Sequence, residues 1–170
     1  TENVIMAASL ANGRTRILNA AKEPEIIDLA NCLIRMGASI KGAGNSEIII
    51  DGVKELKGCN HKVIPDRIEA GSFAIAAAIT KSSLELYDCE PKHLESLSKK
   101  LINAGVNWES NKDIINITSE GILRPVNVQT AEYPDFPTDL QAPFMTLMTV
   151  ANGKSEIKEN IFENRFMHVP

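Results

Sequence analysis

A unit of about 70 residues occurs three times along this chain, and this repeat restricts the possible folds more than any other feature. The segment "LANGRTRI" at 10–17 returns as "VANGKSEI" at 150–157, and "AITKSSLEL" at 78–86 resembles both. Acidic residues recur at the same offsets as these segments. Glu23, Glu90 and Glu163 occupy one position in the three copies, and Asp66 and Asp139 occupy another in the last two. Because the unit is longer than a solenoid repeat, we expect three similar subdomains that close on each other.

The residue pattern predicts the same order of elements, β-α-β-α-β-β, in every copy. An apolar helix ("VIMAASLA", "FAIAAAIT", "FMTLMTVA") is followed by a strand ("TRILNA", "SLELYDC", "SEIKENI"). An amphipathic helix comes next, and Gly37 and Gly105 stand where a left-handed residue would end it. Short strands ("EIII", "DIINIT") and a strand leading into the next copy ("HKVIP", "PVNVQT") complete the unit. The copies span about 1–60, 61–125 and 126–170, and the third is incomplete.

The first helix of each copy predicts how the copies pack. The segment "FAIAAAI" has no polar face, and a helix that is apolar all round is normally buried. Three such helices would pack together at the centre of a mixed α/β (α+β) fold, with the sheets outside. The alternative is an ordinary α+β sandwich in which Ala-rich helices cover a sheet.

Composition and charge exclude several classes of function. The 170 residues carry a net charge of −4 without a cluster of Lys and Arg, which argues against a nucleic-acid partner. The longest apolar run is too short to span a membrane, and no signal peptide is visible. The three cysteines, Cys32, Cys59 and Cys89, are widely spaced, which favours a reducing cytoplasm over a disulfide framework or a zinc site. The three histidines do not cluster with acids or cysteines, so we expect no metal and no cofactor.

Four long motifs, in order, resemble one enzyme family. They are "AAKEPEIIDLANCLIRMGASI", "VIPDRIEAGSFAIAAAI", "FPTDLQAPF" and "ENIFENRFMHVP". Together they resemble the UDP-N-acetylglucosamine 1-carboxyvinyltransferase family of enolpyruvyl transferases, over only the middle and later part of that family's chain. The resemblance implies that 1–170 is a fragment of one inside-out α/β barrel domain, truncated, and that a second barrel of the same enzyme is missing from it.

The resemblance also implies a reaction. Such enzymes transfer enolpyruvyl from phosphoenolpyruvate to the 3-hydroxyl of UDP-N-acetylglucosamine and release phosphate, in a cleft between two barrels. This is the first committed step of peptidoglycan synthesis, so we expect a cytoplasmic transferase that serves cell wall biogenesis, cell shape and cell division.

Asp139 is the first candidate catalytic residue. The sugar hydroxyl must lose its proton as it attacks, and a carboxylate within hydrogen-bond reach can accept that proton. Pro134 and Pro137 stiffen the backbone just before Asp139, as positioning of the carboxylate requires. The alternative is that Asp139 only caps the helix that follows, since Asp is a preferred N-cap residue.

The motif "IFENRFM" supplies three further candidates for substrate binding. The resemblance places the backbone carbonyl of Ile161 against the N-acetyl sugar and Glu163 where the family contacts ligand. Arg165 has the forked donors that bind a carboxylate or phosphate. Its alternative role is an exposed ion pair of little energetic value.

Glu23 and Asp66 match family positions that border the cleft. Glu23 would pair with a cationic group of the other domain. The alternative for both is an acid favoured near a helix N-terminus, because their repeat mates are also acids at equivalent positions.

The chain departs from the family in coverage. The cysteine-bearing loop that meets phosphoenolpyruvate, the Lys-Asn pair and the arginines that clamp the phosphate are absent, so we expect this chain alone to be inactive. Two other functions stay open: a non-catalytic module of the same fold that binds a sugar nucleotide or a protein, and the enolpyruvyl transferase of the shikimate pathway.

Overall fold

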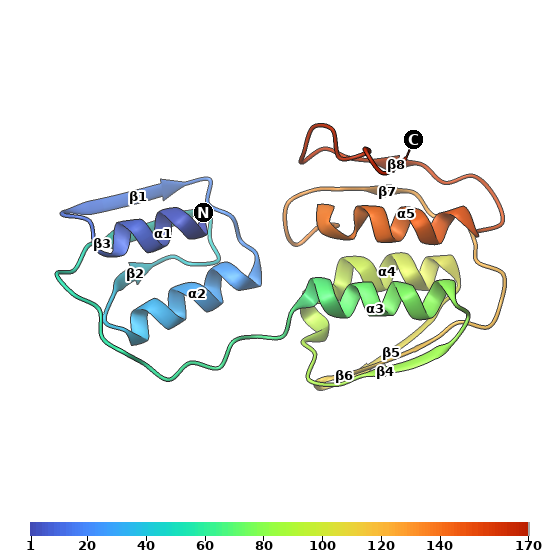
Figure 1. The fold of residues 1–170 in the computed structure, drawn as a ribbon, viewed down its shortest axis with the longest axis horizontal. Coiled ribbons are helices and arrows are strands. Elements are labelled where there is room, and N and C mark those ends of the chain that lie inside the picture. The colour runs from blue at the N-terminus through green and yellow to red at the C-terminus, as the bar shows by residue number, and fades with distance from the viewer. Residues whose placement is uncertain (170) are drawn as a thin grey trace. The chain divides into compact units, whose positions relative to one another are not determined.

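The computed structural model describes residues 1–169. They fall into two compact units, and the chain passes from the first to the second between Ile64 and Pro65 (Figure 1). The boundary at residue 64 falls near the predicted end of the first repeat. The grouping of all three repeats into one domain stays a prediction.

The first unit is a three-stranded antiparallel sheet covered by two helices. It contains α1 (Glu2–Ser9), β1 (Arg14–Leu18), α2 (Pro24–Arg35), β2 (Ser39–Lys41) and β3 (Glu47–Asp51), with strand order β1-β3-β2. Ile48 and Ile50 alternate with charged or half-buried residues along β3 and are fully buried against Ile5 of α1 and Leu33 of α2. On the opposite face, Arg14 lies directly across from Asp51 and forms an ion pair of 2.7 Å with it.

The second unit begins with the same arrangement. Here α3 (Arg67–Ile79), β4 (Ser83–Leu86), α4 (Glu95–Ala104), β5 (Asn107–Asn111) and β6 (Ile114–Thr118) follow in the same order, with the short 3-10 helix η1 (Pro91–Leu94) before α4. The sheet order β4-β6-β5 places the last strand in the middle, as in the first unit. The backbone at Gly37 and Gly105 is left-handed, as predicted for the ends of both amphipathic helices. The two units thus share one element order and one sheet order, while the assignment of the chain to internal repeats stays a prediction.

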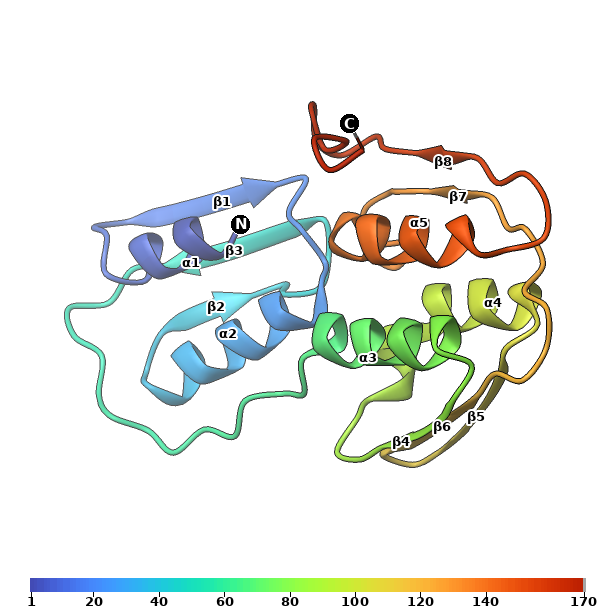
Figure 2. The same ribbon diagram turned by 45° about the vertical axis from the view of Figure 1, so that its right-hand side comes forward.

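The third copy adds a helix between two parallel strands. It consists of β7 (Val128–Gln129), the 3-10 helix η2 (Thr138–Leu140), α5 (Gln141–Thr149) and β8 (Ile157–Lys158), and β7 pairs in parallel with β8. In Figures 1 and 2, α3, α4 and α5 lie between the β4-β6-β5 sheet on one side and the β7-β8 pair on the other. The helices of this unit thus form its interior, with fully buried side chains from each: Ala74, Leu97, Leu101, Phe144 and Leu147.

Two local expectations were wrong. The segment "HKVIP" at 61–65 forms no strand, because the extended chain there has no neighbouring strand to pair with. The first helices are also less buried than their composition indicates, since Met6 of α1 is 46% exposed and Phe73 of α3 is 53% exposed. Each of these helices buries only the face that meets its own unit.

Gly71 of α3 permits the close packing that positions η2. A Cβ atom at residue 71 would lie 2.7 Å from Cδ1 of Leu140 and 3.1 Å from Cδ2 of Leu97, and both leucines are fully buried. We predict that Gly71→Ala destabilises the second unit by about 1–3 kcal/mol, as overpacking of a core does. Denaturant unfolding followed by the fluorescence of Trp108, the single tryptophan, measures this loss.

Gly121→Ala is the matched control, because a Cβ atom there meets nothing within 4 Å and the residue is exposed. Its free energy of unfolding is expected to stay within about 0.5 kcal/mol of that of the original chain. Equal stability of the two variants would show that α3 and η2 are not in close contact.

Candidate active site

A rigid turn leads into Asp139. Between β7 and η2, the amide of Ala131 donates to the carbonyl of Phe136 over 3.0 Å, which closes residues 131–136 into a loop. The Tyr133–Pro134 peptide bond is cis, and the guanidinium of Arg67 stacks over the Tyr133 ring at 5.4 Å. Pro134 lies within this loop, and Pro137 directly follows it as the N-cap residue of η2.

Asp139 does not cap a helix. It is the middle residue of η2, and neither η2 nor α5 has a side-chain capping hydrogen bond. Its Oδ1 atom instead accepts a hydrogen bond of 2.9 Å from Nη2 of Arg165. The helix-cap alternative for Asp139 is thus wrong, and its carboxylate faces a cation that comes from the far end of the chain.

The ion pair between Asp139 and Arg165 is exposed to solvent. The side chain of Asp139 is 52% exposed and that of Arg165 is 38% exposed, and the guanidinium also stacks on the Phe162 ring at 5.3 Å. Exposed ion pairs contribute about 0–1 kcal/mol to stability. The pair is therefore a weak structural bond, and both charged groups remain accessible to a ligand.

Glu159 connects the three segments that make up this site. Its Oε1 atom accepts hydrogen bonds from Thr130 Oγ1 (2.9 Å) and from the amides of Ile161 (2.8 Å) and Phe162 (3.1 Å). Its Oε2 atom accepts one from Thr138 Oγ1 (2.9 Å), immediately before Asp139. We call this set of bonds the Glu159 network. Nothing in the sequence singles out Glu159, because its partners lie up to 29 residues away.

The Glu159 network also orients the backbone carbonyl of Ile161. That carbonyl and the amide of Phe162 belong to the same peptide plane and point in opposite directions when the peptide is trans. Because the Phe162 amide points at Glu159, the Ile161 carbonyl points away from it. Within the described residues this carbonyl accepts no hydrogen bond, so it is left to bind another molecule.

The environment of Glu159 lowers the pKa of its carboxyl group. Partial burial raises this pKa, but the hydrogen bonds from the Ile161 amide, Thr138, the Phe162 amide and Thr130 together lower it by more. The network therefore depends on the charged form of Glu159.

The remaining candidates occupy different places. Asp66 is the N-cap of α3, where its Oδ1 accepts from the amides of Ile68 (2.8 Å) and Glu69 (3.1 Å), so the capping role is confirmed for this residue. Glu23 lies in the first unit, before α2, and its Oε2 atom is buried without a hydrogen-bond partner among the described residues. Glu163 is exposed, between Phe162 and Arg165 in the C-terminal turn.

A cavity of about 640 Å³ is lined by residues of η1 and α4 and by several residues between 129 and 136, including Lys99, Lys100, Tyr133 and Phe136. Asp139 is not among its lining residues. Within residues 1–169, no group of three or more His, Cys, Asp or Glu side chains is arranged to hold a metal ion. No helix in the same range has the length and apolar character needed to cross a membrane.

The fold is that of enolpyruvyl transferases. The enolpyruvyl transferase NikO from Streptomyces tendae superimposes with a TM-score of 0.79 over 94% of this chain and 39% of its own, at 23% sequence identity. At this identity the likeness concerns the fold alone.

The chain belongs to the EPSP synthase (3-phosphoshikimate 1-carboxyvinyltransferase) family, whose family model matches residues 1–170. Among curated relatives, the UDP-N-acetylglucosamine 1-carboxyvinyltransferases of Shewanella sediminis and Shewanella pealeana are 55% and 54% identical to it over the whole chain. The chain spans 41% of the length of each of these relatives.

We predict that Glu159→Gln destabilises the second unit by about 1–3 kcal/mol at neutral pH. The substitution removes the charge that strengthens four hydrogen bonds and places an amide donor opposite other donors. Urea unfolding, followed by Trp108 fluorescence, measures the difference. Glu156→Gln is the control, since Glu156 is 60% exposed and forms an ion pair of 3.4 Å with the neighbouring side chain of Lys158. A loss as large in the control as in Glu159→Gln would contradict a special role for the network.

The difference in unfolding free energy between the original chain and Glu159→Gln should depend on pH. Because the folded-state pKa of Glu159 is lowered, its stabilisation is fully present above the unfolded value of about 4.3 and is lost as the pH falls through the folded value. The gap in unfolding free energy between the original chain and Glu159→Gln should therefore narrow below about pH 4. A gap of constant size down to pH 2, measured in the same urea series, is the contrary result.

Proposed function

We propose that this chain carries the sugar-side half of the active site of a carboxyvinyltransferase. The complete enzyme would transfer enolpyruvyl from phosphoenolpyruvate to the 3-hydroxyl of UDP-N-acetylglucosamine and release phosphate. The curated relatives that share 55% and 54% of its residues bear the name of this activity. The observation that carries the proposal is an accessible carboxylate, Asp139, that caps no helix and is held beside Arg165 at 2.9 Å.

Asp139 would act as the general base. The 3-hydroxyl oxygen of the sugar would add to C2 of the enol phosphate while C3 takes up a proton, and loss of phosphate from C2 with a proton from C3 would then give the enolpyruvyl ether. The hydroxyl proton must leave as the new C–O bond forms. A carboxylate within hydrogen-bond reach of that hydroxyl accepts the proton, which is typically worth a factor of about 10²–10⁴ in rate. The proline turn and the Thr138 contact to Glu159 support this role, because they limit the freedom of η2.

The neighbouring groups would bind the substrate. The Ile161 carbonyl, directed away from Glu159, suits the amide N–H of an N-acetyl group. Arg165, whose guanidinium lies 2.9 Å from Asp139, would bind an anionic part of the ligand. Glu163, Asp66 and Glu23 remain proposed contacts at the border of the cleft, Asp66 in addition to its capping role.

The complete protein would contain two inside-out α/β barrels with the site between them. The interior helices of the second unit support this architecture, as does the αβαββ order shared by the two units. Phosphoenolpyruvate would be bound largely by parts of the enzyme outside this chain. This reaction would belong to peptidoglycan synthesis in the cytoplasm, where the protein would support cell wall biogenesis, cell shape and cell division.

Two other functions can be separated from this one by substrate tests. The enolpyruvyl transferase of the shikimate pathway would use shikimate 3-phosphate as acceptor in place of the sugar nucleotide; the names of the most similar curated relatives favour the sugar nucleotide. A non-catalytic module would bind UDP-N-acetylglucosamine or a protein without releasing phosphate in the complete enzyme.

In the complete enzyme, Asp139→Asn should lower kcat by about 10²–10⁴-fold. The amide keeps the size of the side chain but cannot accept the proton. Phosphate release with phosphoenolpyruvate and UDP-N-acetylglucosamine measures the loss. Asp135→Asn, in the same exposed turn and outside the Asp139–Arg165 pair, is the control and should retain near-normal activity. Unchanged kcat for Asp139→Asn would exclude Asp139 as the base.

The 170-residue chain alone should release no phosphate from the same two substrates. Charge stabilisation of the reacting phosphoenolpyruvate is the largest contribution expected in such a reaction, and the groups that supply it lie outside this chain. Detectable turnover by the purified chain would overturn this division of the active site.

A further inference from the structure

We propose that Cys32 and Cys59 form a reversible intramolecular disulfide and so constitute a redox modification site in the first unit. The two Sγ atoms lie 3.9 Å apart, although the residues are 27 positions apart in the sequence. Both thiols are free in this structure. The proposal concerns a different part of the chain from the candidate active site and does not depend on the proposed function.

The two cysteines meet because two residues of α2 face two residues of the segment 52–64. Asp28 and Cys32 are four residues apart on α2 and therefore lie on one face, about 6 Å apart along the axis. Cys59 and His61 are two residues apart in the segment 52–64, which contains no helix or strand, and both side chains contact α2. Cys59 thus reaches Cys32 where His61 reaches Asp28, at 2.9 Å between Nε2 and Oδ1.

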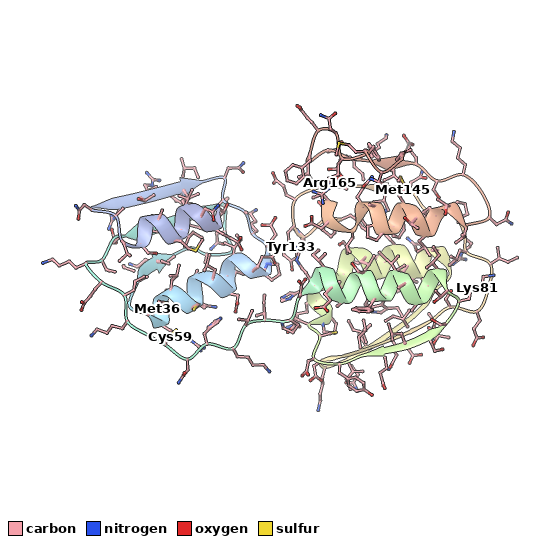
Figure 3. All side chains as sticks on the ribbon, viewed as in Figure 1. Met36, Cys59, Lys81, Tyr133, Met145 and Arg165 are labelled. Carbon is pink, nitrogen blue, oxygen red and sulfur yellow. The ribbon has the colours of Figure 1, made fainter. Side chains whose placement is uncertain are left out.

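Further contacts fix the extended segment in this register. The amide of Lys57 donates to the carbonyl of Met36 over 2.8 Å, and Nη1 of Arg35 donates to the carbonyl of Asn60 over 3.3 Å. Figure 3 shows Cys59 beside the end of α2, next to Met36. The pair formed by His61 and Asp28 is largely shielded, with side chains 11% and 15% exposed. The thiols are therefore held close by bonds on both sides of Cys59.

The two thiols differ in accessibility, which assigns their roles. Cys59 is exposed and lies on a segment without helix or strand, so a small oxidant reaches it first. Cys32 is half-buried on α2, and burial, followed by its contact with Cys59, raises the pKa of its thiol. Cys32 is therefore the thiol that attacks second, once Cys59 has been modified. Its attack becomes faster as the pH rises, because the thiolate is the attacking form.

The oxidant is a low-molecular-weight disulfide such as oxidised glutathione. The Cys59 thiolate attacks one of its sulfur atoms, and the first glutathione leaves as a thiolate that takes up a proton. The Cys32 thiolate then attacks Sγ of Cys59, and the second glutathione leaves in the same way. The protein loses two protons and two electrons, and one oxidised glutathione takes them up to become two reduced molecules. The bond requires the two sulfur atoms to approach from 3.9 Å to about 2.05 Å. The segment 52–64 can make this movement, since it belongs to no helix or sheet.

The product would fasten the segment 52–64 to α2. This segment ends the first unit and leads directly into the second at Pro65. In the reduced protein it is held by hydrogen bonds and one His–Asp contact, which open and close locally. A covalent bond at Cys59 would stop that opening until a thiol reduces it.

Peptide mapping after treatment with oxidised glutathione tests the proposal. The protein is blocked with iodoacetamide and digested with trypsin without reductant. Mass spectrometry should then show residues 23–35 joined to residues 58–62, at the mass of the two peptides less two hydrogen atoms. Dithiothreitol should separate them. The digest also reports the state of Cys89, which is buried in the second unit.

Two variants distinguish the proposed mechanism from simple modification. Cys32→Ser should retain glutathione on Cys59 as a stable adduct, because the resolving thiol is gone, whereas Cys89→Ser should give the same joined peptides as the original chain. Three results would overturn the proposal: a lasting glutathione adduct on Cys59 of the original chain, joined peptides that appear only in a dimer on a non-reducing gel, or a disulfide that includes Cys89.

Discussion

Four hydrogen bonds converge on the carboxylate of Glu159, and the geometry of the candidate active site depends on them. They join the end of β7, the residue before Asp139 and two backbone amides of the C-terminal turn. Hydrogen bonds to a charged acceptor are roughly twice as strong as those between neutral groups. One partly buried anion thus holds in place an exposed carboxylate, a free backbone carbonyl and, through the turn, the guanidinium of Arg165.

Stability and proposed function are separated within a few residues. Leu140 is fully buried against Gly71 of α3 and anchors η2, while its neighbour Asp139 is 52% exposed and forms an exposed ion pair with Arg165. An ion pair of that kind adds little to the free energy of unfolding. Asp139 therefore sits on a rigid support without being part of it, which is the arrangement that a positioned catalytic group requires.

The repeat made the element order predictable, but contacts between distant residues were not. The similarity of "LANGRTRI" and "AITKSSLEL" predicted units with the same element order, because the local residue pattern indicates helix, strand and turn. The sheets of the two units also have the same strand order. Asp66 and Asp139 occupy the same repeat position, yet one caps a helix and the other meets Arg165, a difference that tertiary contacts decide. Glu159 and the Cys32–Cys59 pair could not be found from the sequence, because nothing local marks either.

The most direct test of the proposed site is a crystal structure of the complete protein with UDP-N-acetylglucosamine bound. The Asp139 carboxylate should lie about 2.6–3.2 Å from the sugar 3-hydroxyl, or be joined to it through one water. The Ile161 carbonyl should accept the N–H of the acetamido group while Glu159 keeps its four donors. A sugar whose 3-hydroxyl faces another acid or base, with Asp139 still bound only to Arg165, would contradict the assignment of the base.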